Sequence, residues 1–210
     1  VAGVGRFRIS CFYQRNQVGM VLRRIETKIP TIEELSLPVI LKSLSMTKRG
    51  VIICVGATGT GKSTTLAAMI GYRNLNSTGH IITIEDPIEF RFDQDKSLIE
   101  QREVGIDTKD FHTALTHVFR QDADVIMIGE MRDKETISAA VTAAETGHLV
   151  LSTIHANSAA QTIDRIIDSF SAEQQDQIRL QLASSLLGIL SQRLIPRVSG
   201  GLIPAFELLL

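Results

Sequence analysis

From residue 51 onward, apolar runs of strand length alternate with helical patterns. Four of these runs, residues 51–55, 81–84, 125–128 and 149–152, have no polar face, which is typical of strands covered on both sides in a parallel sheet. Strands alternating with helices predict an α/β fold with a mostly parallel sheet. Apolar residues at helical spacing predict the helices: Phe111, Leu115, Val118 and Phe119; Ile137, Ala140, Val141 and Ala144; and, after a cap at residues 171–174, Ile178, Leu182, Leu186, Ile189 and Leu190.

The first 50 residues have a different pattern. Residues 5–13 alternate polar and apolar side chains and residues 19–25 form a second extended segment, so we predict two strands joined by a turn at 14–17. Residues 31–34, Thr-Ile-Glu-Glu, match a capping box and predict a helix that continues to about Leu44. We therefore expect three parts: an opening unit, residues 1–30; a linker helix, residues 31–48; and an α/β core, residues 49–210.

Composition narrows the class of protein. The 210 residues carry a formal net charge of -1, with no basic stripe of the kind that nucleic-acid binding requires. No apolar run approaches the roughly 18 residues that span a bilayer. Cys11 and Cys54 are far apart and without metal-ligand spacing, which predicts reduced thiols in a cytosolic protein. The chain begins at Val1 without a signal pattern, and we interpret it as a piece of a longer protein.

The clearest chemical signal is the glycine-rich segment 56–64. Its first eight residues, Gly-Ala-Thr-Gly-Thr-Gly-Lys-Ser, match G-x-x-x-x-G-K-[ST] at every fixed position. The flanking strand and helix patterns favour a phosphate-binding loop over an ordinary turn, because they direct peptide N–H groups and a helix N-terminus at one point. We predict that ATP binds here, with Lys62 on its β and γ phosphates and the Ser63 hydroxyl on Mg²⁺. The loop residues predicted to bind are Gly56, Thr58, Gly59, Thr60, Gly61, Lys62, Ser63 and Thr64.

Acidic residues follow two of the apolar runs. Phosphoryl transfer needs a metal-holding acid and a group that orients the attacking water, and ligands gather at the carboxyl ends of parallel strands. Glu130 follows run 125–128 as the metal-holding acid would, although Gly129 stands where an aspartate is usual. Three more acids follow run 81–84: Glu85, Asp86 and Glu89. Spacing alone does not choose among these three, and any single one could instead be a solvated loop carboxylate.

His148 and His155 flank the run 149–153. Taken alone, each is better interpreted as a structural or surface histidine, since neutral imidazoles commonly satisfy local hydrogen bonds. The alternative is a polar sensor that reaches the γ-phosphate from a strand end.

Four ordered blocks together resemble the secretion and type IV pilus motor ATPases. They are residues 56–64; residues 84–90, IEDPIEF; residues 128–133, IGEMRD; and residues 144–157, AETGHLVLSTIHAN. These look like the Walker A, Asp box, Walker B and His box of that family. The resemblance implies a RecA-like P-loop core preceded by the last strands of a PAS-like N-terminal domain.

The resemblance also implies roles for individual residues. Glu89 would polarise the lytic water, Glu130 would act through the metal, and His148 and His155 would sense the γ-phosphate. Arg8 and Arg23 look like the arginines that the family brings to the phosphates from its N-terminal domain; otherwise they belong to a solvated strand face. Arg120 and Arg132 match arginines near the nucleotide and the subunit interfaces.

The absence of one sequence feature indicates to which branch of the family this chain is most similar. Extension and secretion motors usually carry a cysteine-rich zinc insertion after the segment equivalent to residues 191–194, and this chain has no cysteine there. That favours the retraction branch, the PilT/PilU twitching-motility ATPases, and residues 1–10, 46–50 and 152–157 look closer to the PilU group. The resemblance then implies a Mg²⁺-dependent homo-hexamer in the cytoplasm at the bacterial inner membrane, working with the pilus platform protein and a paralogous ATPase. The family's C-terminal helices are not in this sequence.

Other functions remain open at this point. They are an extension or type II secretion ATPase of the same superfamily, a P-loop kinase acting on a small acceptor, and an interaction module ordered by nucleotide without force generation. A nucleic-acid motor is disfavoured by the charge balance.

Overall fold

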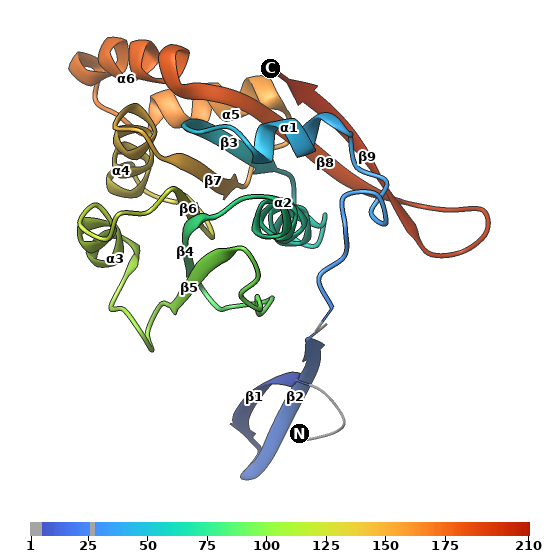
Figure 1. Ribbon diagram of the computed structural model, residues 1–210. Helices are drawn as coiled ribbons and strands as arrows, with labels where there is room; N and C mark the ends of the chain where they lie inside the picture. The colour runs from blue at the N-terminus through green and yellow to red at the C-terminus, as the bar shows by residue number, and fades with distance from the viewer. Residues whose placement is uncertain (1–5, 26–27) are drawn as a thin grey trace.

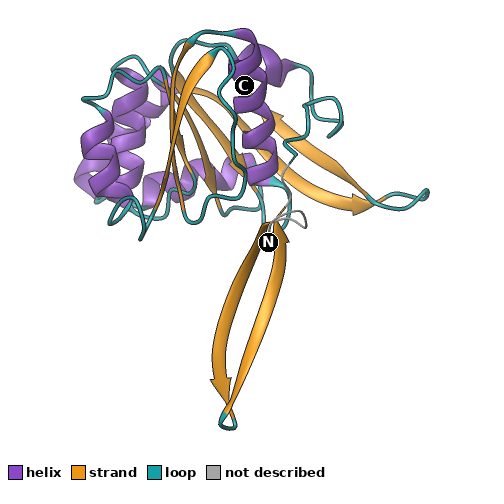
Figure 2. Cartoon of the chain, turned by 60° about the horizontal axis from the view of Figure 1, so that its bottom comes forward, coloured by secondary structure: helices purple, strands orange, loops and turns teal. Residues whose placement is uncertain are grey.

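A two-stranded hairpin precedes the α/β core in the computed structural model, which describes residues 6–25 and 28–210. The hairpin strands are β1 (Arg6–Gln14) and β2 (Gln17–Ile25), and Figures 1 and 2 show them projecting from the core. Arg15 and Asn16 at the turn both have positive φ, of 48° and 57°, as a two-residue hairpin of the tight primed type requires. Both predicted opening strands are therefore confirmed, except that Gly5 lies outside the described residues.

The core is built on a seven-stranded sheet in the order β5-β4-β6-β7-β3-β8-β9. All neighbouring strands are parallel except β8 and β9, which form an antiparallel edge. The strands are β3 (Gly50–Val55), β4 (Gly79–Glu85), β5 (Ser97–Glu103), β6 (Val125–Ile128), β7 (Leu149–Ile154), β8 (Leu186–Pro196) and β9 (Leu202–Leu209). The four apolar runs are the four central strands β3, β4, β6 and β7, and the predicted mostly parallel sheet is confirmed.

Helices cover both faces of this sheet (Figure 2). They are α1 (Ile40–Ser45), α2 (Lys62–Asn76), α3 (Phe111–Val118), α4 (Lys134–Glu145), α5 (Ala159–Asp168) and α6 (Ala172–Ser185). Successive side chains of β3 point to opposite faces. Ile52 and Cys54 join the core under α1 and α2, whereas Val51, Ile53 and Val55 join the core under α3 to α6. Burial on both faces explains why these strands have no polar side.

The two cysteines lie in very different surroundings. Cys54 is fully buried, and burial raises the pKa of its thiol to about 12. Cys11 on β1 is exposed, and neither thiol forms a disulfide.

The predicted helix from residue 31 to 44 is wrong in extent. The capping box does form: the Thr31 N–H donates to Glu34 Oε2 at 2.8 Å and the Glu34 N–H donates to Thr31 Oγ1 at 3.1 Å. The chain then makes only turns, with Ser36 at φ 55°, and α1 begins at Ile40. Pro38 explains the break, because a proline lacks the N–H for a helix interior and disfavours helical geometry in the residue before it. The division of the chain at residues 30 and 48 stays a prediction.

The last predicted helix is also wrong at its end. Leu186, Ile189 and Leu190 belong to β8, since α6 ends at Ser185. Three strands that the sequence analysis did not predict extend the sheet beyond the predicted four, β5 on one side and β8 and β9 on the other. Side chains of β5 bond to the segment that carries Glu89, and side chains of β8 contact the phosphate loop and the cavity.

Candidate nucleotide site

The glycine-rich segment connects the central strand β3 to α2 and lies at the carboxyl edge of the parallel strands. Gly61, with φ 88°, is the N-cap of α2, and Gly56 has φ 148°. A Cβ atom on Gly56 would lie 2.5 Å from the backbone oxygen of Gln192, so no larger residue fits without displacing the neighbouring strand. Glycine is therefore needed here both for its backbone conformation and for the close approach of β8.

Lys62 lies at the first turn of α2 and is only 8% exposed. Its Nζ donates to the backbone oxygens of Gly56 at 2.9 Å and of Ala57 at 2.8 Å. Burial lowers the pKa of Lys62, and the nearby charges of Glu130 and Glu89 oppose that shift. The ammonium group is thus held inside the curve of the loop.

The loop opens on a cavity of about 500 Å³ that both the core and the hairpin line. The cavity unites most of the predicted site residues, although they come from segments far apart in the sequence. Those that line it are Arg8, Arg23, Thr58, Gly59, Gly61, Lys62, Ser63, Thr64, Glu89, Glu130 and His155. Gly56 lines a second pocket, described below, and the Thr60 hydroxyl donates to the Ala57 oxygen within the loop.

Glu130 is held by two basic side chains. Arg132 Nε donates to Glu130 Oε2 at 2.7 Å, and His155 Nε2 lies 3.3 Å from Glu130 Oε1. The hydrogen bond to Glu130 raises the pKa of Arg132, whose guanidinium also lies 4.0 Å from Asp86. This cluster brings the end of β6 and the end of β7 together beside the phosphate loop.

The structure distinguishes between the acids that follow β4. Glu85 is buried, and its Oε1 accepts from the Thr83 hydroxyl at 2.6 Å and from Gln101 Nε2 at 3.1 Å. Burial raises the pKa of Glu85. All three acids line the cavity, but Glu85 is buried there whereas Asp86 and Glu89 are exposed, and Asp86 lies 4.0 Å from the Arg132 guanidinium. The surroundings therefore favour Glu89 over Glu85 as the acid that meets a water molecule in the cavity.

Two side chains of β5 fix the loop that carries Glu89. Gln101 Nε2 donates to the Phe90 oxygen at 2.8 Å, and Gln101 Oε1 accepts from the Phe92 N–H at 2.9 Å. Glu103 accepts from the Ile88 N–H at 3.0 Å. The sequence analysis missed both residues because β5 is amphipathic and has no continuous apolar run.

The prediction that His148 senses the γ-phosphate is wrong for the phosphate loop of its own chain. His148 precedes β7 and His155 follows it, so seven residues at about 3.3 Å each separate them by roughly 20 Å along the strand. His148 lies at the end of the sheet away from the loop, where its Nδ1 bonds to the Ala143 oxygen at 2.9 Å. Of the two loosely assigned arginines, Arg132 lines the cavity, whereas Arg120 is exposed just after α3.

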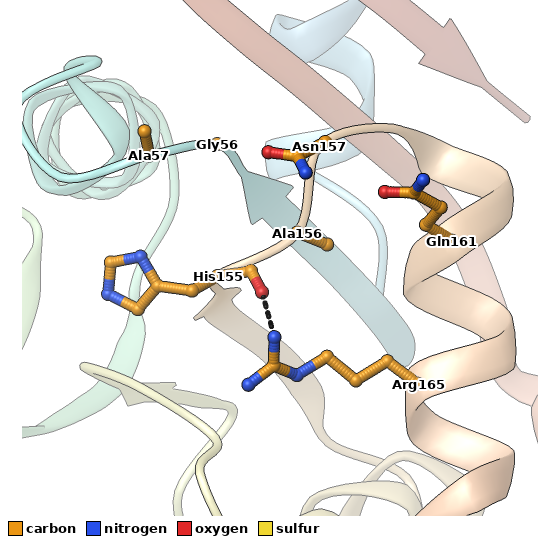
Figure 3. Close-up of a pocket in the computed structure, with 7 residues that line it drawn as sticks. All are labelled: Gly56, Ala57, His155, Ala156, Asn157, Gln161 and Arg165. Atoms are coloured by element: carbon orange, nitrogen blue, oxygen red, sulfur yellow. Dashed lines mark hydrogen bonds between the residues drawn. The ribbon is translucent and has the colours of Figure 1, made fainter.

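A second pocket, of about 300 Å³, lies between the loop's first residues and α5 (Figure 3). His155 contributes its backbone here, and Arg165 Nη1 donates to the His155 oxygen at 2.7 Å. The lining comprises Gly56, Ala57, His155, Ala156, Asn157, Gln161 and Arg165. Contacts from α5 therefore fix the segment that carries His155.

Comparison with known proteins places this geometry in a family. The family model described as "Type II/IV secretion system protein" matches residues 6–200. The chain belongs to this family. The type IV pilus ATPase PilU of Pseudomonas aeruginosa is 61% identical over 198 residues, which cover 94% of this chain and 52% of PilU. PilT, the type IV pilus retraction ATPase of the same organism, is 49% identical over 210 residues, which cover 100% of this chain and 61% of PilT.

Solved structures of the family agree with the fold. A crystal structure of the pilus retraction motor PilT with bound ADP superposes with a TM-score of 0.97 at 52% identity, covering 100% of this chain and 61% of that one. The predicted family and its P-loop α/β core are therefore confirmed. The chain spans between 52% and 61% of the length of these relatives. Over residues 6–25 and 28–210, none of the helices combines the length and apolar character needed to cross a membrane.

Proposed function

We propose that this protein hydrolyses Mg-ATP and uses the energy to drive a type IV pilus motor. The observation that carries the proposal is the single cavity in which the phosphate loop, Glu89, Glu130 and two hairpin arginines meet. Membership in a family whose relatives are named as pilus ATPases supports the same reaction.

Binding of the phosphates would depend on the loop. Its peptide N–H groups and the N-terminus of α2 favour an anion, and Lys62 adds a full positive charge. Ser63 and Glu130 provide a hydroxyl and a carboxylate oxygen in the same cavity. Such hard oxygen ligands suit Mg²⁺, which proteins usually hold through one or two side chains together with substrate phosphates. The ion, when bound, would neutralise charge that develops on the phosphate oxygens.

Hydrolysis also needs an oriented water molecule. Glu89 would accept a hydrogen bond from that water, since it is exposed within the cavity and its loop is fixed by β5. His155, which contacts Glu130, would lie near the terminal phosphate. Arg8 and Arg23 would add positive charge from the hairpin side, where charge on the transferred phosphoryl group is spread over its oxygens.

The wider role is also part of the proposal. We propose a homo-hexamer that powers pilus retraction, located in the cytoplasm beside the inner membrane, with the platform protein and a paralogous ATPase as partners. The similarity to the pilus ATPases PilU and PilT supports the pilus motor, and the similarity to PilT, a retraction ATPase, supports retraction. An extension or secretion motor of the same family is the alternative, and type II secretion proteins E are 42–44% identical over about 70% of this chain.

The decisive experiment compares the full chain with its Lys62→Ala variant. We expect the unmodified chain to bind ADP with Mg²⁺ in calorimetry and to release phosphate from ATP only when Mg²⁺ is present. Lys62→Ala should abolish binding or turnover, because it removes the charge nearest the phosphates. Wild-type turnover in that variant would contradict the site. Tight ATP binding by the unmodified chain without any turnover would favour the nucleotide-gated interaction module.

A further inference from the structure

Gln192 is a buried polar residue that neither the sequence analysis nor the proposed reaction uses. It lies on β8 and is 3% exposed, and each end of its carboxamide bonds to the phosphate-loop region. Its Nε2 donates to the Thr60 backbone oxygen at 2.8 Å, and its Oε1 accepts from the Thr65 hydroxyl at 2.8 Å. Thr60 precedes Lys62 and Thr65 follows it, so one side chain connects the end of the loop to the first turn of α2.

The sheet register explains why Gln192 reaches the loop. The last paired residue of β3 is Val55, whose partner on β8 is Ser191. Gln192 is the next residue of β8 and therefore lies beside Gly56, where the chain leaves the sheet. Cβ atoms added to the glycines would lie 2.5 Å from the Gln192 backbone oxygen at Gly56 and 2.9 Å from Gln192 Nε2 at Gly61. Strand β8 thus contacts the loop at both ends.

Burial limits what Gln192 can do. At 3% exposure its side chain is not available to touch a nucleotide, so any effect on binding must pass through Thr60 and Thr65. Without the carboxamide, the buried Thr65 hydroxyl and the half-buried Thr60 oxygen would lose their partner, and the loop could then relax away from its present shape. A loop N–H group that is displaced by a few tenths of an ångström would make a weaker hydrogen bond to a phosphate oxygen.

We propose that Gln192 is a positioning residue that fixes the phosphate loop in the shape that binds nucleotide phosphates. The inference rests on the proposed nucleotide site. Gln192 acts from behind the loop, and its carboxamide suits the task because it supplies one donor and one acceptor at the same time.

The test uses Gln192→Met, Thr65→Val and the double variant, each in the full chain and well below its unfolding temperature. Methionine keeps the length of the side chain without either hydrogen bond, and valine keeps the shape of threonine without its hydroxyl. We expect Gln192→Met to raise the Kd for Mg-ADP and the KM for ATP about tenfold, with kcat changed less than about threefold. The double variant should cost no more than Gln192→Met alone, because the shared bond is already lost.

Arg193→Met is the matched control, since it places the same side chain on the next, exposed position of β8 and should leave the Kd unchanged. If Gln192→Met lowers the melting temperature but leaves the Kd and KM unchanged, Gln192 has only a structural role and the inference is overturned. Should Gln192→Met fail to fold, Thr65→Val gives the same comparison with an expected rise of about threefold, and no rise overturns the inference. If the unmodified chain binds no nucleotide, the proposed function fails as well. If the unmodified chain binds nucleotide and the variants bind it with the same Kd, only the proposed role of Gln192 is contradicted.

Discussion

Glu85 and Glu89 are four residues apart in the segment that follows β4, yet they have opposite surroundings. Both line the cavity, but Glu85 is buried and bonded to Thr83 and Gln101, whereas Glu89 is exposed. Their spacing in the sequence could not separate them, because burial depends on β5, which pairs with β4 in register up to Glu85 and Glu103. The carboxylates therefore have different expected tasks, one in holding the segment and one in chemistry.

Glu89→Gln tests the chemical task. The amide keeps the size of the side chain but cannot accept a proton from water, so turnover should fall about 10²-fold or more. Binding of Mg-ADP should stay within about twofold of the unmodified chain, because Glu89 contributes little to holding the phosphates in the proposal. Steady-state kinetics measure the turnover, and calorimetry measures the binding of Mg-ADP. Unimpaired turnover in this variant would remove Glu89 from its role.

Glu85→Gln tests the structural task through pH. Burial raises the pKa of Glu85 in the folded chain, so the folded state binds more protons than the unfolded state between the ordinary and the raised pKa. Stability contributed by the protonated form is present below the ordinary pKa and is lost as pH rises through the folded pKa. Glutamine stays neutral and still accepts from Thr83. We therefore expect Glu85→Gln to become more stable relative to the unmodified chain as pH rises from about 4 to 8.

Denaturant unfolding at several pH values, without nucleotide, measures this difference. A stability difference between the two proteins that does not change with pH contradicts the raised pKa of Glu85.

Among the strands, the apolar pattern identified those that are buried on both faces. β3, β4, β6 and β7 lie inside the sheet, and their side chains fill two cores, so the sequence carries a continuous signal for them. β5 is partly exposed and mixes polar with apolar residues, which gives no such signal. In β8, the spacing of Leu186, Ile189 and Leu190 imitates a helical stripe, although the chain is extended there. Local pattern cannot decide such cases, because pairing with β3 and β9 decides them.

The missed strand β5 supports a further prediction. Gln101→Leu should leave nucleotide affinity within about twofold but lower kcat about tenfold, because the backbone of Phe90 and Phe92 loses its partners and Glu89 is held less firmly. Glu100→Leu is the control on the same strand, since successive side chains point to opposite faces. Kinetics of both variants check the prediction. Equal loss in the two would mean that β5 matters only for stability.

The site as a whole depends on contacts that join distant parts of the molecule. The phosphate loop could be predicted in full because its residues are contiguous and its chemistry needs that spacing. Parallel strands that end at one edge explain why Glu89, Glu130 and His155 meet, although the choice of Glu89 and His155 rested on the family resemblance. His148 stands at the opposite end of its strand, away from the loop. Gln192 and Gln101 could not be foreseen, because their partners are backbone atoms that only the tertiary fold brings near.

The hairpin adds charge to the site in a way that the register makes clear. Arg8 and Arg23 are directly opposite each other in the β1–β2 ladder, so both side chains lie on one face. Like charges in such a pair repel, and an anion between them relieves the repulsion. Both arginines line the cavity that contains Lys62, whereas Arg24 pairs with Phe7 on the other face.

Replacing the two arginines tests whether the hairpin takes part in binding. Arg8→Gln with Arg23→Gln should raise the KM for ATP about tenfold and reduce its dependence on salt, because two charges near the phosphates are lost. Arg24→Gln removes a charge from the same strand on the opposite face and should change neither quantity. Kinetics at several salt concentrations measure both. If Arg24→Gln has the same effect as the double variant, the hairpin acts only through its overall charge.

The difference in exposure between the two thiols allows the hairpin to be labelled selectively. Cys54 is enclosed beneath α2 and keeps its proton at neutral pH, so a maleimide dye would attach at Cys11 and leave the core untouched. Cys11 belongs to the opposite face of the ladder from Arg8, and a probe there would not obstruct the cavity. The native sequence thus already carries a single attachment point for a fluorescent reporter, which would show whether the hairpin moves relative to the core during turnover without any engineered residue.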